Sequence, residues 1–164
     1  KVVRKGKNNQ PPISGFSLSG PTDKDSTQEV LSHPFAVLLF CEDFSTPLSA
    51  WKEDFETIYV RARSKNIPVY LVTARPGEAR TVIATTGFAG IPVFKCDYKA
   101  IATAARTNPC LYLLEKGTVT GKWSYRTMEN ALDLLEKIPQ QTAPVPVIPA
   151  DTTSAAMDTL NREP

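Results

Sequence analysis

The sequence has few of the side chains that usually carry catalysis or bind metals. It contains one histidine, His33, and three cysteines, Cys41, Cys96 and Cys110. The cysteines lie far apart in the chain and lack the spacing of a zinc site. We therefore expect no metal centre and no cofactor.

Concentrated charge and long apolar runs are also missing. The formal net charge is only +2, and the Lys and Arg residues are scattered, which argues against a nucleic-acid partner. No apolar run approaches the ~20 residues that a membrane-spanning helix needs, and no signal peptide is visible. The first residue is Lys1 rather than Met. We therefore expect the sequence to be a piece of a longer protein.

Composition divides the chain into three parts. Residues 1–12 carry four positive charges and no negative one, which is typical of a solvated linker. The same pattern also fits a juxtamembrane segment on the cytoplasmic side of a bilayer. Residues 139–164 contain five prolines and few large apolar side chains, so we expect a disordered tail. Residues 13–138 remain as one folded domain.

The most informative stretch is a buried strand that runs through a short polar loop into a helix. Residues 35–40 are continuously apolar, the pattern of a strand covered on both faces. Thr46 could cap a helix that has Pro47 at its first position. The apolar stripe expected on this helix consists of Leu48, Trp51, Phe55, Ile58, Tyr59 and Ala62. Such a junction is where α/β folds usually place their functional groups.

The rest of the domain predicts a succession of strands and helices. The expected elements are a short edge strand at 13–18, a strand at 67–73, a helix from Pro76 to Gly87, a strand at 92–95, a helix capped by Asp97, a hairpin over 107–124 with its turn at Lys116–Gly117, and a helix capped by Thr127 and ended by Pro139. Alternation of strands and helices favours right-handed crossovers and a largely parallel sheet core.

This order of elements resembles the thioredoxin-like fold, in its TlpA and peroxiredoxin-like branch. The resemblance implies an α/β domain with a central mixed β-sheet flanked by helices, an N-terminal edge strand and a helix–strand insertion. Ser45-Thr46-Pro47-Leu48 lies where that family has Cys-Gly-Pro-Cys. The resemblance therefore implies that both the nucleophilic and the resolving cysteine of the family are replaced.

A second point of resemblance is Asn108-Pro109-Cys110, where thioredoxins have a cis-proline beside the active site. A cis Asn108–Pro109 peptide bond is therefore expected. Residues 106–123 and 71–76 are also similar to the C-terminal thioredoxin-like domain of DoxX-like membrane proteins of Bacteroidetes. That similarity implies a bacterial domain attached to a membrane through a missing N-terminal region. The membrane face stays open, because the basic flank favours the cytoplasmic side and the TlpA-like branch is usually outside it.

Two functional hypotheses follow. In the first, the domain is a redox-inactive interaction or accessory module that binds a protein partner or its own transmembrane region. The expected binding groove is formed by Phe44, Ser45, Thr46 and Pro47 on one side and by Asn108 and Pro109 on the other, with the Phe44 ring partly exposed. In the alternative, the domain is an atypical thiol–disulfide oxidoreductase or redox sensor. That activity would use Cys41 and Cys110, expected as neighbours at one end of the sheet with Cys96 remote from both.

Two further readings of the polar loop are weaker. An anion could bind at Ser45 and Thr46, but Glu42 and Asp43 place negative charge in the same loop and no glycine-rich segment accompanies it. Ser45 as a hydrolytic nucleophile would need a base, and His33 is expected at the opposite end of the strand.

Overall fold

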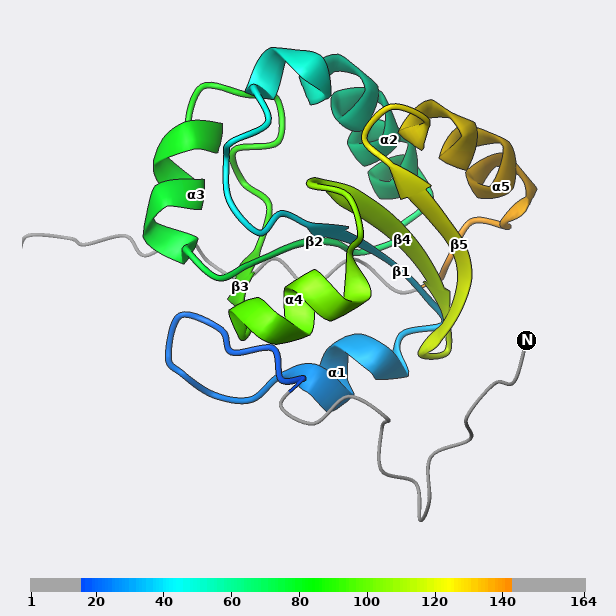
Figure 1. The fold of residues 1–164 in the computed structure, drawn as a ribbon. Coiled ribbons are helices and arrows are strands. Elements are labelled where there is room, and N and C mark those ends of the chain that lie inside the picture. The colour runs from blue at the N-terminus through cyan, green and yellow to red at the C-terminus, as the bar shows by residue number, and fades with distance from the viewer. Residues whose placement is uncertain (1–15, 143–164) are drawn as a thin grey trace, which may run out of the picture.

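The computed structural model describes residues 16–142, which form one mixed five-stranded sheet with the strand order β3-β2-β1-β4-β5 (Figure 1). Three neighbouring strands are parallel, namely β1 (Phe35–Phe40), β2 (Val69–Thr73) and β3 (Val93–Lys95). The antiparallel hairpin β4 (Cys110–Glu115) and β5 (Thr118–Ser124) extends the sheet on the other side of β1. The linker expected at 1–12 and residues 143–164 of the tail expected at 139–164 lie outside the described residues.

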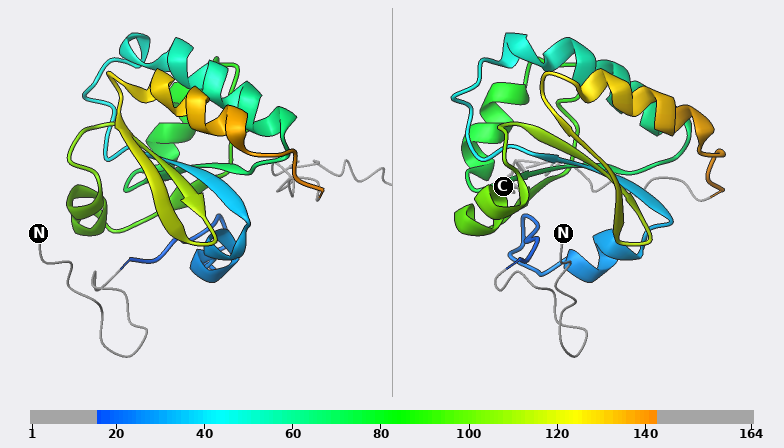
Figure 2. Two further views of the ribbon diagram at one scale, coloured as in Figure 1. Left: turned by 90° about the vertical axis from the view of Figure 1, so that its right-hand side faces the viewer. Right: turned by 45° about the vertical axis from the view of Figure 1, so that its right-hand side comes forward.

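Helices cover both faces of the sheet (Figures 1 and 2). They are α1 (Thr27–Ser32), α2 (Lys52–Ser64), α3 (Pro76–Ile83), α4 (Tyr98–Ala104) and α5 (Ala131–Lys137). Helices α2, α3 and α5 pack on one face, whereas α1 and α4 pack on the other. Among residues 16–142, no helix is both long and apolar enough to cross a lipid bilayer.

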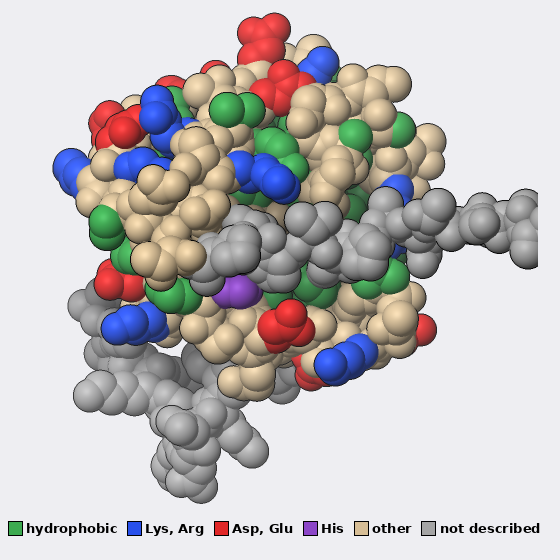
Figure 3. Space-filling model, turned by 180° about the vertical axis from the view of Figure 1, so that it is seen from behind, with side chains coloured by type: hydrophobic (Ala, Val, Ile, Leu, Met, Phe, Trp, Pro, Cys, Tyr) green, Lys and Arg blue, Asp and Glu red, His purple; other side chains and the backbone are tan. Residues whose placement is uncertain are grey.

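Strand β1 is apolar throughout because both of its faces are buried. Val37 and Leu39 face the core cluster that contains α2, while Leu38 and Phe40 face the cluster that contains α1 and α4. Side chains of a strand alternate between the faces, so both sets need apolar residues. The reverse face of the molecule carries Lys, Arg, Asp and Glu side chains interspersed with apolar ones (Figure 3).

Several local predictions are confirmed. Pro76 is the first residue of α3, and the Asp97 side chain caps α4 by accepting hydrogen bonds from the backbone N–H groups of Lys99 and Ala100. The turn between β4 and β5 places Lys116 at φ 47° and Gly117 at φ 75°, the left-handed backbone that a tight hairpin requires.

The boundaries of the helices differ from the prediction. Helix α2 begins at Lys52 rather than at Pro47, because a 3₁₀ turn over Leu48–Ala50 precedes it. A second 3₁₀ turn over Met128–Asn130 precedes α5, and the Thr127 side chain makes no capping hydrogen bond.

Two further differences concern the edges of elements. Helix α3 ends at Ile83, before Gly87. In the described part of the expected edge strand and the residues after it, only Ser19 pairs with the sheet, through an isolated bridge to Lys95 of β3. Residues 13–15 of that strand lie outside the described residues.

Candidate functional site

The candidate site lies at the carboxyl end of β1, where the chain leaves the sheet. The segment that follows, residues 41–47, is called the β1 loop here. It lies beside residues 107–109, which lead into β4, because Phe40 at the end of β1 pairs with Cys110 at the start of β4. The peptide bond between Asn108 and Pro109 is cis, the isomer expected for it. The fold thus brings together the two segments that the sequence assigned to one groove.

The side chain of Asn108 joins these two segments. Its Nδ2 donates hydrogen bonds to the backbone oxygen of Asp43 at 3.0 Å and to Asp43 Oδ1 at 2.7 Å. Its Oδ1 accepts a hydrogen bond from the backbone N–H of Glu42 at 3.0 Å. One amide group therefore holds the β1 loop against the start of β4 through three contacts.

Asp43 also stabilises the β1 loop, through hydrogen bonds from Ser45. Its Oδ1 accepts hydrogen bonds from the backbone N–H of Ser45 at 3.0 Å and from the Ser45 hydroxyl at 2.6 Å. These two bonds, with smaller contributions from Asn108 and the Arg75 charge, lower the pKa of Asp43 below its ordinary value. An aspartate that binds the backbone two residues later is a common turn-forming arrangement.

Thr46 does not cap the helix that follows. Its hydroxyl donates a hydrogen bond to the backbone oxygen of Asn108. The expected groove needed that backbone to be available to a partner, so an internal contact already occupies one of its two acceptor positions. Pro109, expected to line the groove, is buried by the chain itself.

Fewer residues of the expected groove are accessible to a partner than the sequence suggested. Ser45 and Pro47 are exposed, while Phe44 is half-buried and packs against the core cluster that contains α2. The partly exposed ring expected for Phe44 is therefore confirmed. Tyr98, which the sequence did not point to, is 56% exposed. The Glu42 carboxylate raises the pKa of its phenol, so Tyr98 lies next to the loop.

Cys41 and Cys110 lie at one end of the sheet, as expected, but on opposite faces of it. Directly paired residues of antiparallel strands lie on the same face, so Cys110 shares the face of Phe40. Cys41 is the next residue after Phe40 and faces the opposite side, in the cluster that contains α2, whereas Cys110 lies in the cluster that contains α1 and α4. A disulfide needs converging Cβ vectors, which opposite faces of a sheet do not give. The oxidoreductase hypothesis that rested on this pair is therefore overturned.

The environment of each cysteine also disfavours the thiolate. All three are free and buried. Burial, followed by the negative charges of Asp43, Glu78 and Glu42, raises the pKa of Cys41 to about 12, and its Sγ donates a hydrogen bond to the backbone oxygen of Asp43 at 3.0 Å. Burial likewise raises the pKa of Cys110 and of Cys96. A thiol with a raised pKa is a poor nucleophile near neutral pH.

Cys96 lies at the end of β3, and strands β2 and β1 separate it from β4. It nevertheless belongs to the same core cluster as Cys110.

Neither of the weaker readings of the loop gains support. His33 precedes β1 and lies at the opposite end of that strand, where its Nε2 shares a hydrogen bond with the Tyr70 hydroxyl at 2.9 Å. The Ser45 hydroxyl is held by a carboxylate, and Glu42 adds negative charge next to it. Within residues 16–142, no three His, Cys, Asp or Glu side chains are placed to hold a metal ion.

The sequence did not predict the role of Asp43 in the site. It placed Asn108 in the groove but did not predict the hydrogen bonds of its side chain. The pattern Asp43-Phe44-Ser45 is a local signal for the aspartate turn, because the carboxylate and the backbone N–H that donates to it are two residues apart. No local signal connects Asn108 to Asp43, which is 65 residues away in the chain.

Comparison with known proteins supports the fold. No protein-family model matches the chain, and no curated protein matches it. The solution structure of a thiol:disulfide interchange protein from Bacteroides sp. is similar at 9% identity and a TM-score of 0.55, over 74% of this chain and 86% of that one. The bacterioferritin comigratory protein of Xanthomonas campestris gives 16% identity and a TM-score of 0.54, over 73% and 89% of the two chains.

The exposed lipoprotein thioredoxin of Streptococcus pneumoniae gives 19% identity and a TM-score of 0.53, over 76% of this chain and all 100% of that one. Identities this low establish the architecture and nothing finer. The described residues form a thioredoxin-like α/β domain, with a mixed five-stranded sheet flanked by helices.

Proposed function

We propose that this protein is a redox-inactive thioredoxin-like module that binds an extended segment of a protein partner at the β1 loop. The observation that carries the proposal is the hydrogen-bond network of Asn108, Asp43, Ser45 and Thr46. This network fixes the conformation of the loop. The loop lies at the position where thioredoxins have their reactive cysteines. A preformed loop binds a partner at a lower cost in conformational entropy than a loose one.

The surface available to a partner consists of Phe44, Ser45 and Pro47, with Tyr98 close by. Two aromatic side chains that are partly exposed can supply most of the binding energy of a small contact. The Asn108 carbonyl oxygen keeps one acceptor position for the backbone of an extended peptide, in the manner of strand addition.

The redox part of the proposal is tested by an insulin-reduction assay on the full chain. We expect no turnover above the uncatalysed background, because Ser45 and Leu48 occupy the thiolate and resolving positions. Turnover at a rate comparable to that of a thioredoxin would overturn redox inactivity while leaving the binding surface open to separate test.

The binding part is tested by selecting peptides from a displayed random library against the full chain. Peptides that use the β1 loop should lose affinity when Phe44→Ala removes the half-buried ring. Val60→Ala is the matched control, because Val60 is an apolar residue of α2 that is 65% exposed. If no peptide is selected, or if Phe44→Ala and Val60→Ala bind the selected peptides equally well, the β1 loop is not the binding surface.

Attachment to a membrane protein, as in the DoxX-like proteins, remains a further part of the proposal. The sequence features behind it are the basic residues 1–12 and the similarity over 106–123. The complete open reading frame tests it, since apolar spans upstream of residue 1 are expected. Their loop charges would then indicate the membrane face.

A further inference from the structure

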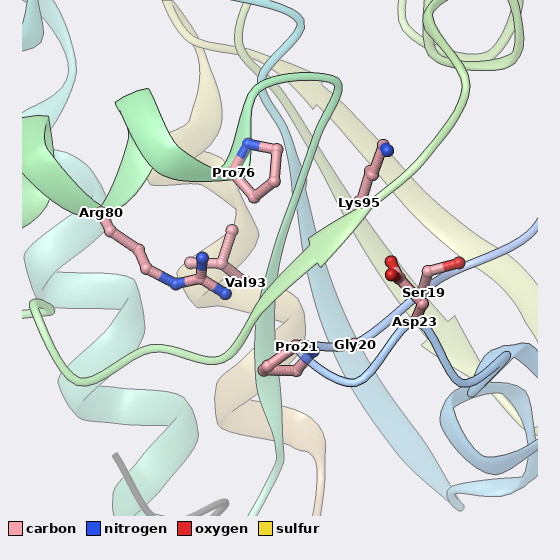
Figure 4. A pocket seen from close by; sticks show the side chains of 8 residues that line it. All are labelled: Ser19, Gly20, Pro21, Asp23, Pro76, Arg80, Val93 and Lys95. Carbon is pink, nitrogen blue, oxygen red and sulfur yellow. The ribbon is translucent and has the colours of Figure 1, made fainter. Parts of the chain in front are cut away.

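A second feature of the molecule is a surface cavity of about 200 Å³ next to the outer edge of β3 (Figure 4). Its lining includes no residue of the β1 loop. Its walls come from the turn after Ser19, from the start of α3 and from β3. The lining residues are Ser19, Gly20, Pro21, Asp23, Pro76, Arg80, Val93 and Lys95.

The sequence spacing explains why two positive side chains meet there. Pro76 and Arg80 are four residues apart on α3, so both lie on the same side of the helix. Val93 and Lys95 are two residues apart on β3, so both lie on the same face of the sheet. Since α3 packs on that face, Arg80 and Lys95 flank one cavity.

The third wall is held by backbone hydrogen bonds. Ser19 N–H donates to the Lys95 oxygen at 2.9 Å, and Lys95 N–H donates to the Ser19 oxygen at 2.8 Å. Asp23 then closes the turn with φ at 55°, a left-handed conformation that a residue other than glycine adopts infrequently. The cavity is therefore built from regular elements and a fixed turn.

The charges in the cavity are not balanced internally. Among the described residues, neither Arg80 nor Lys95 forms an ion pair, although Arg75, which precedes α3, pairs with Glu78 of that helix at 3.3 Å. Asp23 is the single acidic residue of the lining, so the lining contains two cationic side chains and one carboxylate. An excess positive charge in a concave site favours an anionic ligand.

We propose that this cavity binds a small organic anion through its carboxylate or phosphate group, with Arg80 and Lys95 as the principal contacts. The guanidinium fork and the ammonium group both suit oxyanions, and Val93, Pro21 and Pro76 offer apolar contact to the rest of the ligand. The cavity is smaller than the roughly 300–1,000 Å³ of sites for drug-sized ligands. A small metabolite fits that volume better than a nucleotide.

The test follows amide chemical shifts of the isotope-labelled full chain during separate titrations with inorganic phosphate and with acetate at constant ionic strength. We expect saturable shifts centred on Gly20, Asp23 and Lys95 with at least one of the two anions. The anion that binds more tightly tells a phosphate site from a carboxylate site. If neither anion gives saturable shifts at these residues, the proposal is wrong.

Variants then test the named contacts. Arg80→Gln and Lys95→Gln should each weaken binding by about threefold or more, the effect of removing one exposed charge contact. Arg106→Gln and Lys99→Gln are the matched controls, since both residues are exposed and do not line the cavity. Asp23→Asn should strengthen binding. Equal affinities for the cavity variants and the controls, or binding unchanged in Asp23→Asn, would contradict the charge argument. The outcome is independent of peptide binding at the β1 loop.

Discussion

Lys65, at the carboxyl end of α2, is expected to be a main support of the C-terminal helix α5. Its ammonium group donates hydrogen bonds to the backbone oxygens of Leu135, Glu136 and Ile138, each at 2.7 Å. The side chain is only 15% exposed, and the Glu136 carboxylate lies 3.8 Å from Nζ. One cation thus contacts three carbonyl groups at the end of α5, where helix carbonyl groups lack most of their intrahelical donors.

The size of this effect follows from the geometry. A hydrogen bond to a charged group contributes about 1.5–3 kcal/mol, and a cation at a helix C-terminus adds about 0.3–1 kcal/mol. The three bonds do not add fully, because water can reach the carbonyl groups once the ammonium is gone. We expect Lys65→Met, which keeps the length of the side chain, to lower the free energy of unfolding by about 2–3 kcal/mol. For a domain of this size, that loss corresponds to a fall in Tm of roughly 8–12 °C.

Urea denaturation followed by far-UV circular dichroism measures the loss. The control is Lys137→Met, because Lys137 lies in the last turn of α5 but is exposed. We expect this control to change stability by less than about 0.5 kcal/mol. If Lys65→Met and Lys137→Met lose the same small amount, the three carbonyl contacts do not stabilise the helix and the reasoning is refuted.

Three further predictions concern the sheet edge, the buried thiol and the loop. Gly121→Ala should destabilise the protein and shift its tryptophan fluorescence, because the added Cβ would lie 2.0 Å from the Trp123 ring; unchanged fluorescence and stability would contradict this. Cys41 should resist alkylation at pH 8 in the folded protein, because a pKa of about 12 leaves about one thiolate in ten thousand; rapid alkylation without unfolding would argue against its burial. The pKa of Asp43 is lowered on folding, so its contribution to stability is present above its unfolded pKa of 3.8 and is lost as the pH falls through the lower folded value. In an NMR titration, the Asn108 side-chain amide should report protonation of Asp43 only below about pH 3.8. A change in its chemical shift at higher pH would refute the lowered pKa of Asp43.

The local chemistry of the sequence was sufficient to predict the order of the main elements. An apolar run such as residues 35–40 must be covered on both faces wherever it lies, and the structure covers it on both faces. Asp97 and the Lys116–Gly117 turn act through neighbouring backbone atoms, so their effect does not depend on the rest of the fold. These features place the β1 loop at the carboxyl end of a central strand.

The start of α2 depended on a contact that is distant in sequence. Thr46 and Pro47 form a good local signal for a helix start, but the Thr46 hydroxyl bonds to the Asn108 oxygen, 62 residues away. That contact holds the Thr46 side chain against the segment that leads into β4, and the chain makes a 3₁₀ turn before the helix begins at Lys52. Capping would use the hydroxyl oxygen as an acceptor and the bond to Asn108 uses its proton, so the two roles do not compete for one proton. The tertiary contact instead fixes where the Thr46 side chain lies, and local sequence signals do not specify that contact.

The register of β1 against β4 determines on which face of the sheet Cys41 and Cys110 lie. The sequence placed Cys41 and Cys110 correctly at one end of the sheet, and a register in which they paired directly would have put both on one face. The observed pairing of Cys110 with Phe40 differs from that register by one residue and separates the two thiols across the sheet. Side chains alternate with a period of two along a strand, so a shift of one residue reverses the face. Register is a property of the packed sheet and its turn, and for that reason only the tertiary structure determined that these cysteines do not form a redox pair.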